Sequence, residues 1–282
     1  MADATVPRVG RNAADTTVAP YGLAVATADL FEDGSGIPKL LNLKTIWRQT
    51  PKIVSFPGSG EFGGRLAVSP DQRYLFIAAG DRQEFDPVQD LSNSLGKVVR
   101  LYIDGTIPSD NPYVTTAGAL QEIWTLGHRN PYGLAFDSAG QLWDNENGPL
   151  RGDELNLLKP GLNYGWPKVS YGNNYDGGFI TKPAPGDGFE PAAVWWTPAI
   201  APSGLIFYKG TLFGDWKGDA IISGLAGMCL VRVRFTGSTA AEVQRIPMGA
   251  RIRAVEEAAD GTVWVLEDGV KARLLQLLPV FA

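Results

Sequence analysis

The sequence predicts an all-β protein of the β-propeller type, and two observations carry this prediction. The chain of 282 residues contains 34 glycines and 20 prolines, which favours many tight turns between short strands. Four segments also share one plan, in which a glycine leads into an apolar strand, a polar turn follows, and a second strand ends in glycine or acidic residues. Recurring strand–turn–strand units are typical of propeller blades, whereas a β-sandwich gives short strands without such a repeat.

The four segments begin near residues 63, 131, 202 and 252 and read "GGRLAVSPDQRYLFIAAGD", "PYGLAFDSAGQLWDNENG", "PSGLIFYKGTLFGDWKGDAIISGLAG" and "IRAVEEAADGTVWVLEDG". Their equivalent positions Leu66, Leu134, Leu205 and Val255 follow one another at steps of 68, 71 and 50 residues. Each segment is followed by a further strand candidate: "KVVRLYI", "DELNLL", "CLVRVRF" and "ARLLQLL". We therefore expect a single domain over residues 1–282, built from sheets of three or four strands.

The N-terminal part differs from the four repeats. Residues 1–15 are expected to be irregular, and residues 16–56 read as the outer strands of a blade whose inner strands are missing. A closed propeller of six blades at this spacing needs more residues than the chain has. The expectation is about four full blades plus part of another, incomplete at the N-terminus, with exposed sheet edges that closure would protect.

Composition excludes several classes of function. The net charge of −5, with no concentrated basic face, argues against a nucleic-acid partner. No apolar run is long enough to span a membrane, and the N-terminus lacks the basic start and apolar core of a signal peptide. As written the chain reads as cytoplasmic, unless a natural leader has been removed. Cys229 lies in an apolar run, lacks an internal partner and is expected to be a buried core thiol.

Two polar clusters flank the second repeat. "TLGHRNPYG" carries the only histidine, His128, for which a satisfied structural role is favoured over chemistry, and Arg129, whose planar fork can meet a carboxylate or a quinone oxygen. "NENGPLRGDELN" interleaves Glu146, Asp153 and Glu154 with backbone carbonyls, the mixture that calcium takes. On composition alone, a solvated acidic turn is the stronger interpretation of this second cluster.

Two further clusters precede the third and fourth repeats. In "VWWTPAIAPSG", the neighbours Trp195 and Trp196 face opposite sides of a strand, so one can pack inward while the other borders a ligand. In "GARIRAVEE", Arg251 and Arg253 share one face. Because two adjacent guanidinium groups repel each other, either an anionic ligand or a structural partner must lie between them.

Taken in order, "GHRNPYGLAFD", "ENGPLRGDELNLLKPGLNYGWPKVSYG", "WTPAIAPSG", "GLAG" and "RIRAV" resemble the soluble aldose sugar dehydrogenases that depend on pyrroloquinoline quinone (PQQ), the glucose/sorbosone dehydrogenase family. The resemblance runs from about Leu40 to the end of the chain. It implies a six-bladed β-propeller, in agreement with the repeats, and the oxidation of the anomeric carbon of aldoses to lactones. It also implies export to the periplasm or secretion, although this chain shows no signal peptide.

The resemblance implies roles for individual residues. The positions implied to contact PQQ are Arg129, Asn130, Asn147, Asp153, Trp196, Arg251 and Arg253. The carbonyls of Gly148 and Pro149 are implied to hold a calcium ion beside PQQ, and Glu154 and the region of Tyr164 a second, structural calcium. Ala226 stands where some members carry a PQQ-binding lysine. An aldose substrate and an artificial or respiratory electron acceptor follow from the family, and a homodimer is compatible with it.

Glu61 is the main departure from the family pattern, because the position before Gly-Gly-Arg normally holds a histidine that acts as the catalytic base. A glutamate there could serve as the base with shifted activity, together with Arg129. It could equally mark a catalytically impaired propeller that binds PQQ, a sugar or a partner. A calcium-dependent hydrolase, such as a lactonase, is a weaker alternative because its carboxylates usually come from several blades.

Overall fold

A computed structural model describes residues 19–32, 34, 36–54, 60–237 and 239–279, and its regular structure is almost entirely antiparallel β-sheet. Five sheets follow one another along the chain. Their strands are β1 (Ala24–Phe31) and β2 (Lys39–Arg48); β3 (Gly63–Val68), β4 (Tyr74–Ala79), β5 (Lys97–Tyr102) and β6 (Ile123–Leu126); β7 (Pro131–Phe136), β8 (Leu142–Glu146), β9 (Asp153–Leu158) and β10 (Val194–Trp196); β11 (Pro202–Phe207), β12 (Ala220–Gly224), β13 (Cys229–Thr236) and β14 (Thr239–Pro247); and β15 (Ile252–Glu257), β16 (Val263–Glu267) and β17 (Leu274–Leu277).

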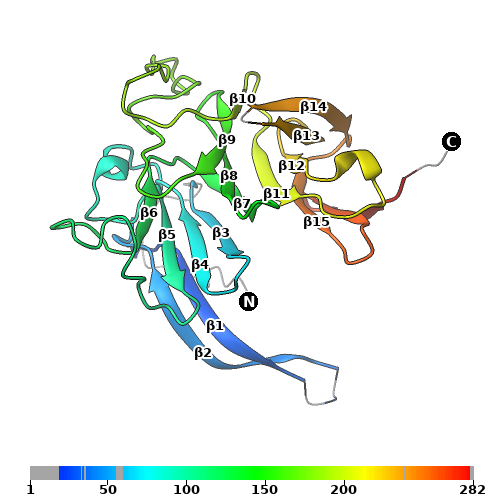
Figure 1. Ribbon diagram of the computed structural model, residues 1–282, viewed down its shortest axis with the longest axis horizontal. Coiled ribbons are helices and arrows are strands. Elements are labelled where there is room, and N and C mark those ends of the chain that lie inside the picture. The colour runs from blue at the N-terminus through cyan, green and yellow to red at the C-terminus, as the bar shows by residue number, and fades with distance from the viewer. Residues whose placement is uncertain (1–18, 33, 35, 55–59, 238, 280–282) are drawn as a thin grey trace, which may run out of the picture.

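The first strands of the four larger sheets lie together at the centre of the molecule. Strand β7 packs between β3 and β11, and β15 packs on the other side of β11 (Figure 1). Each sheet then runs outward in chain order, as propeller blades do. Two short 3₁₀ helices, Asp86–Gln89 and Gly214–Trp216, are the only helices in the described ranges.

The hydrophobic core lies between neighbouring sheets rather than within one of them. Alternating strand residues send apolar side chains to both faces, so each sheet contributes to two clusters. One cluster joins β7–β10 to β11–β14 through Trp143, Leu205 and Val231, and another joins β3–β6 to β7–β10 through Phe76 and Leu134. The β1–β2 hairpin packs on β4 and β5 in the same way.

The predicted repeat is confirmed. The four equivalent positions fall in the innermost strands β3, β7, β11 and β15, and the four later candidates fall in β5, β9, β13 and β17. Strands β1 and β2 form the two-stranded sheet expected of outer strands, while residues 1–18 and 55–59 lie outside the described part. Among the described residues, the structure contains no helix with the length and apolar character needed to cross a membrane.

A tight crossing at the start of β3 fixes the position of Glu61. The backbone of Glu61 is left-handed (φ 52°), and its carbonyl lies so close to Gly80 that a Cβ there would sit 2.1 Å from this oxygen. Gly80 is therefore required for the two segments to meet. The crossing brings Glu61 beside the end of β4.

Candidate functional site

The predicted polar residues gather where the four innermost strands begin, just before Gly63, Pro131, Pro202 and Ile252. We call this end of the molecule the mouth. A larger cavity of about 540 Å³ lies at the opposite ends of the same strands, between Leu134, Phe207 and Glu256 among others. None of the residues predicted for the site lines that cavity. The predicted polar residues and the larger cavity therefore lie at opposite ends of the strands. We assign the candidate site to the mouth because the charged groups converge there.

Arg129 is the centre of the mouth. One terminal nitrogen donates to the carbonyls of Asn147 (3.0 Å) and Gly148 (2.7 Å), and the other donates to the Glu61 carboxylate (2.8 Å). The guanidinium also lies near the ring of Trp166, 5.4 Å from its centroid. With 8% of its side chain exposed, Arg129 is held on several sides by groups that match its fork.

Glu61 lies at the mouth, where its carboxylate contacts Arg129 and is largely removed from solvent. Its side chain is 12% exposed, and one oxygen forms the ion pair with Arg129. The other oxygen accepts a hydrogen bond from Gln83 Nε2 at 2.6 Å. Each carboxylate oxygen has a second lone pair, which leaves Glu61 able to accept a hydrogen bond from a ligand hydroxyl.

Asp81 is a member of the site that the sequence did not single out. It follows β4, is 1% exposed, and accepts hydrogen bonds from Trp166 Nε1 (2.7 Å) and the Gln83 backbone (2.8 Å). Burial raises the pKa of Asp81 to about 7 from 3.8; its two hydrogen bonds and Arg129 oppose the rise, and Glu61 adds to it. In the sequence, an acidic residue two positions after the apolar strand β4 could have indicated that Asp81 belongs to the site.

Asn130 and Asn147 connect neighbouring sheets. Asn130 accepts a hydrogen bond from the Gly63 backbone (3.2 Å) and donates to the Asn147 side chain (3.2 Å), which in turn donates to the Pro202 carbonyl (2.8 Å). This chain joins the starts of β3, β7 and β11. The side-chain amides of Asn130 and Asn147 therefore fix the starts of these three strands relative to one another.

Asp153 forms hydrogen bonds with backbone N–H groups. Its carboxylate accepts hydrogen bonds from the N–H groups of Gly148 (3.0 Å), Ile200 (2.7 Å) and Ala201 (2.7 Å), and the side chain is buried. Burial raises its pKa, while the three hydrogen bonds oppose that rise. Asp153 thus fixes the loop carrying Gly148 instead of reaching into the mouth.

The residues predicted for two separate calcium ions, Gly148 and Pro149 for one and Glu154 and Tyr164 for the other, lie around a single cavity. Gly148, Pro149, Glu154 and Tyr164 line one small cavity, with about 10 Å³ available to the centre of a water-sized sphere. That is room for a single ion or water. Glu146 also lines it, so two glutamates and the Gly148–Pro149 turn surround the cavity, and residues of these kinds supply the oxygen ligands that calcium takes. Gly148 is necessary to this turn, since a Cβ would lie 2.3 Å from the Arg151 carbonyl oxygen.

The arginine pair has a partner that the sequence analysis did not find. Arg251 Nε lies 2.9 Å from one Asp268 oxygen, and Arg253 lies 3.2 Å from the other. The two arginines therefore face the same way, as predicted, but an internal carboxylate already relieves their repulsion. Arg253 also lies 5.7 Å from the Tyr132 ring, which connects the pair to the rest of the mouth.

The tryptophan assignment needs correction. Trp196 was expected to line the ligand, but it is 4% exposed, belongs to the core beside β11–β14, and donates its indole N–H to Glu242 at 2.8 Å. Trp195 is the exposed neighbour, 47% accessible, and stacks on Tyr171 at 5.0 Å. The two tryptophans do lie on opposite faces of the strand, as predicted, but the buried one is Trp196 and the exposed one is Trp195.

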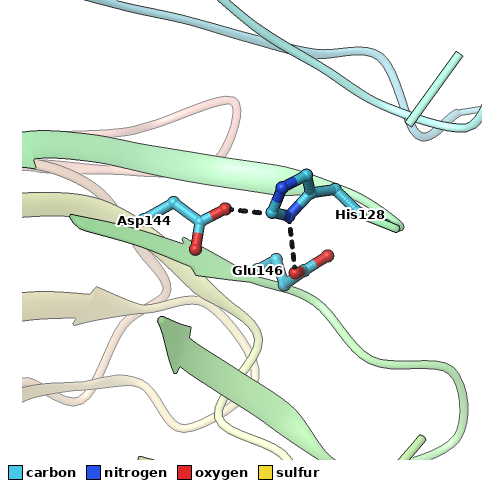
Figure 2. A group of neighbouring side chains, drawn as sticks. All are labelled: His128, Asp144 and Glu146. Atoms are coloured by element: carbon cyan, nitrogen blue, oxygen red, sulfur yellow. Dashed lines mark hydrogen bonds and ion pairs between the residues drawn. The ribbon is translucent and has the colours of Figure 1, made fainter. Parts of the chain in front are cut away.

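His128 lies behind the mouth, buried against Asp144 and Glu146 (Figure 2). Its ring stacks on Tyr164, with 4.9 Å between centroids. It has polar neighbours, as expected of a structural histidine. Cys229, as predicted, is a buried thiol in the core.

Comparison with known proteins identifies the family. Residues 12–276 match the family described as glucose/sorbosone dehydrogenase. The chain belongs to this family. It is 38% identical over 264 residues to aldose sugar dehydrogenase YliI of Escherichia coli strain K12, a match that covers 92% of the chain and 69% of that relative.

Solved structures agree with this family membership. The apo form of the soluble aldose sugar dehydrogenase of E. coli superposes with a TM-score of 0.84 at 37% identity, covering 90% of this chain and 73% of that one. The PQQ-bound aldose sugar dehydrogenase of Streptomyces coelicolor gives a TM-score of 0.71 at 28% identity, covering 92% and 72%. The predicted β-propeller fold is thus confirmed, and the similar proteins are sugar dehydrogenases.

Proposed function

We propose that the chain is a quinoprotein sugar dehydrogenase that oxidises the anomeric carbon of aldoses to lactones with PQQ and calcium. The observation that carries the proposal is the group centred on Arg129, which lies between the Glu61 carboxylate and the Asn147 and Gly148 carbonyls. Membership of the dehydrogenase family and the PQQ-bound relative from S. coelicolor support it. A periplasmic or secreted location, a respiratory or artificial acceptor and a homodimer remain part of this proposal.

The residues present fit both groups. PQQ is a planar polyanion, and the mouth offers the guanidinium groups of Arg129, Arg251 and Arg253 and the amide of Asn130 to its oxygens. Gly148, Pro149 and the neighbouring glutamates line a cavity of ionic size, and their oxygens would hold calcium there. Bound there, PQQ would supply the hydride acceptor and calcium the Lewis acid.

The protein's own part of the reaction is proton transfer and orientation. Glu61 accepts the proton of the anomeric hydroxyl as hydride leaves the anomeric carbon, a general-base step that typically contributes about 100- to 10,000-fold. Gln83 and Arg129 fix the carboxylate in one orientation, so that its remaining lone pairs face the substrate. Arg129 keeps positive charge beside the site where negative charge develops.

The test is reconstitution with PQQ and calcium, followed by dye reduction with several aldoses. We expect quinone absorbance to co-purify and at least one aldose to reduce the dye. Glu61→Gln should then abolish turnover while PQQ is retained, and Glu61→His should raise the rate. Absence of both bound quinone and dye reduction would reject the proposal.

A second function is favoured by one observation, because both oxygens of Glu61 are already engaged by Arg129 and Gln83. This arrangement suits a propeller that binds PQQ or a sugar without turnover. Retained quinone with no dye reduction, together with recovery of turnover in Glu61→His, would establish that alternative.

A further inference from the structure

We propose that His128, Asp144 and Glu146 bind a divalent transition metal of the zinc class, at a site that adjoins the calcium cavity and shares Glu146 with it. One ligand atom from each residue lies within 4.8 Å of the other two, and all three residues are buried (Figure 2). The proposal goes beyond the sugar dehydrogenase function and does not depend on it.

Strand geometry builds the cluster. Asp144 and Glu146 are two residues apart on β8, so their side chains share one face of the sheet. Their cross-strand partners on β9 are Asn156 and Glu154, which lie on that same face. His128 approaches from the segment between β6 and β7. The arrangement therefore adds side-chain contacts between β8 and the β6–β7 segment to the backbone hydrogen bonds that already join them.

The distances suit a tetrahedral ion. His128 Nδ1 lies 3.4 Å from Asp144 Oδ2 and 3.2 Å from Glu146 Oε1. Zinc bonds of about 2.0–2.2 Å at tetrahedral angles place adjacent ligand atoms about 3.3 Å apart. The imidazole therefore already has the spacing to each carboxylate that a bound zinc ion requires, and the two carboxylate oxygens lie within 4.8 Å of each other.

The opposite ring nitrogen has the partner that a metal-binding histidine needs. His128 Nε2 lies 2.8 Å from the hydroxyl of Thr125, which is itself buried. When Nε2–H donates to this hydroxyl, the lone pair of Nδ1 is free for a metal. Glu146 is also oriented by its neighbours, because it accepts hydrogen bonds from the Arg129 backbone (2.6 Å) and from Asn156 (3.1 Å).

The Asp144 carboxylate is the group of this cluster that the chain itself satisfies least. It is fully buried, and among the described residues neither of its oxygens has a hydrogen-bond partner. Asp144, Glu146 and Glu154 bring up to three negative charges together against one imidazole, while the Arg129 guanidinium is directed at Glu61. Burying unpaired charge is costly, and a divalent cation would neutralise two of these charges.

The nitrogen donor decides the class of metal. Calcium takes six to eight oxygen ligands, whereas imidazole with carboxylates suits zinc and its neighbours in the first transition row. Because the ligands are inaccessible to solvent, the ion would fasten β8 to the β6–β7 segment and would not contact substrate.

The experiment uses the intact chain, freed of metal by chelation and then exposed to Zn²⁺ or Co²⁺ in excess calcium. We expect one ion per chain by elemental analysis after desalting, and the intense visible absorption of tetrahedral Co²⁺. Asp144→Asn keeps the side-chain shape and should weaken uptake at least about tenfold, and Thr125→Val should weaken it about 10–100-fold. Asp219→Asn is the matched control, since Asp219 is a buried carboxylate in another sheet, paired with Arg232 and Arg234.

Each outcome decides the proposal. A wild-type chain that is folded by circular dichroism but takes up neither ion would overturn it and leave a protonated carboxyl cluster in its place. Displacement of the ion by excess calcium would also overturn it, as would equal uptake by Asp144→Asn and wild type. None of these readouts requires PQQ or sugar oxidation, so the result is independent of the proposed dehydrogenase activity.

Discussion

The mouth contains two kinds of arginine site. Arg129 is almost buried, and its fork is divided among one carboxylate and two carbonyls. Arg251 and Arg253 have side chains that are 49% and 34% exposed, and both depend on the single carboxylate of Asp268. The first site has one cation balanced by the Glu61 carboxylate, whereas the second has two cations for one anion.

This difference suggests two roles: Arg129 positions its neighbours in the mouth, whereas Arg251 and Arg253 bind an anionic ligand and are called the recruiting pair below. A buried guanidinium whose two terminal nitrogens are both hydrogen-bonded within the chain holds its neighbours in place, and a lysine cannot reproduce these contacts. A half-exposed pair with excess positive charge is free to accept a second anion, at the cost of sharing Asp268. We therefore expect substitutions to affect turnover at the first site and ligand affinity at the second.

The largest effect is expected for Arg129→Lys. An ammonium group cannot span the Glu61 carboxylate and both carbonyls at once, so kcat/KM in the dye assay should fall about 100- to 1,000-fold. Arg234→Lys is the control, because Arg234 is half-exposed and pairs with Asp219 at the end of the β11–β14 sheet opposite the mouth. If Arg129→Lys changed only the affinity for PQQ, Arg129 would belong with the recruiting arginines.

The next effect concerns the pH dependence of stability near Arg129. Because burial raises the pKa of Asp81 to about 7 from 3.8, the folded state keeps a proton there that the unfolded state loses. The Asp81 proton contributes fully to the free energy of unfolding below about pH 4, and this contribution is lost as pH rises through about 7. Its upper limit is about 4 kcal/mol. Denaturation from pH 4 to 8 should therefore show a wild-type stability that falls relative to Asp81→Asn.

A loop aspartate supplies a contrast of opposite sign. Hydrogen bonds from Thr106 lower the pKa of the exposed Asp104. Its stabilisation is present above pH 3.8 and is lost as pH falls further, so Asp104→Asn should leave the interval from pH 5 to 8 unchanged. A parallel curve for Asp81→Asn and wild type over that interval would contradict a buried, proton-binding Asp81.

A smaller effect is expected at the recruiting pair. Arg253→Gln removes one of two cations but leaves Asp268 paired with Arg251, so PQQ affinity should fall about tenfold, equivalent to about 1.4 kcal/mol. The kcat at saturating PQQ should stay near that of wild type. Titration of the metal-loaded protein with PQQ measures the first quantity, and a loss of kcat at saturation would show that Arg253 acts in turnover.

The smallest effect is expected for Asp268→Asn. Arg251 lowers the pKa of Asp268 chiefly through its hydrogen bond, and the carboxylate is partly exposed, so the loss of unfolding free energy should stay below about 1 kcal/mol. PQQ affinity should rise a few-fold because two cations lose their internal anion. Weaker PQQ binding in Asp268→Asn would mean that this carboxylate helps to hold the ligand.

The fold could be predicted from sequence because the propeller repeat is a local pattern. Glycine, apolar strand and polar turn recur in each unit, and strand alternation is enough to locate β3, β7, β11 and β15 through Leu66, Leu134, Leu205 and Val255. The orientation of Trp195 and Trp196 could not be predicted in the same way. Alternation places them on opposite faces, but only packing against β14 determines which one is buried.

The site was predictable in part for a related reason. Arg129, Gly148 and Glu154 lie in short motifs whose chemistry is visible in sequence, and the structure brings them together near the mouth. Asp268 is 15 residues from Arg253, and Asp81 is 48 residues from Arg129, so these partnerships arise from sheet topology alone. A single sequence does not show which charged groups will be paired when they are far apart along the chain.

Trp166 gives the mouth an optical signal of its own. Its indole is 4% exposed, donates to Asp81 and lies near the Arg129 guanidinium. An indole emits at a wavelength set by the charges around it, so the ionisation of Asp81 near neutral pH should shift its emission. Difference fluorescence between wild type and Trp166→Phe therefore reports the charge state of the mouth without substrate, dye or cofactor.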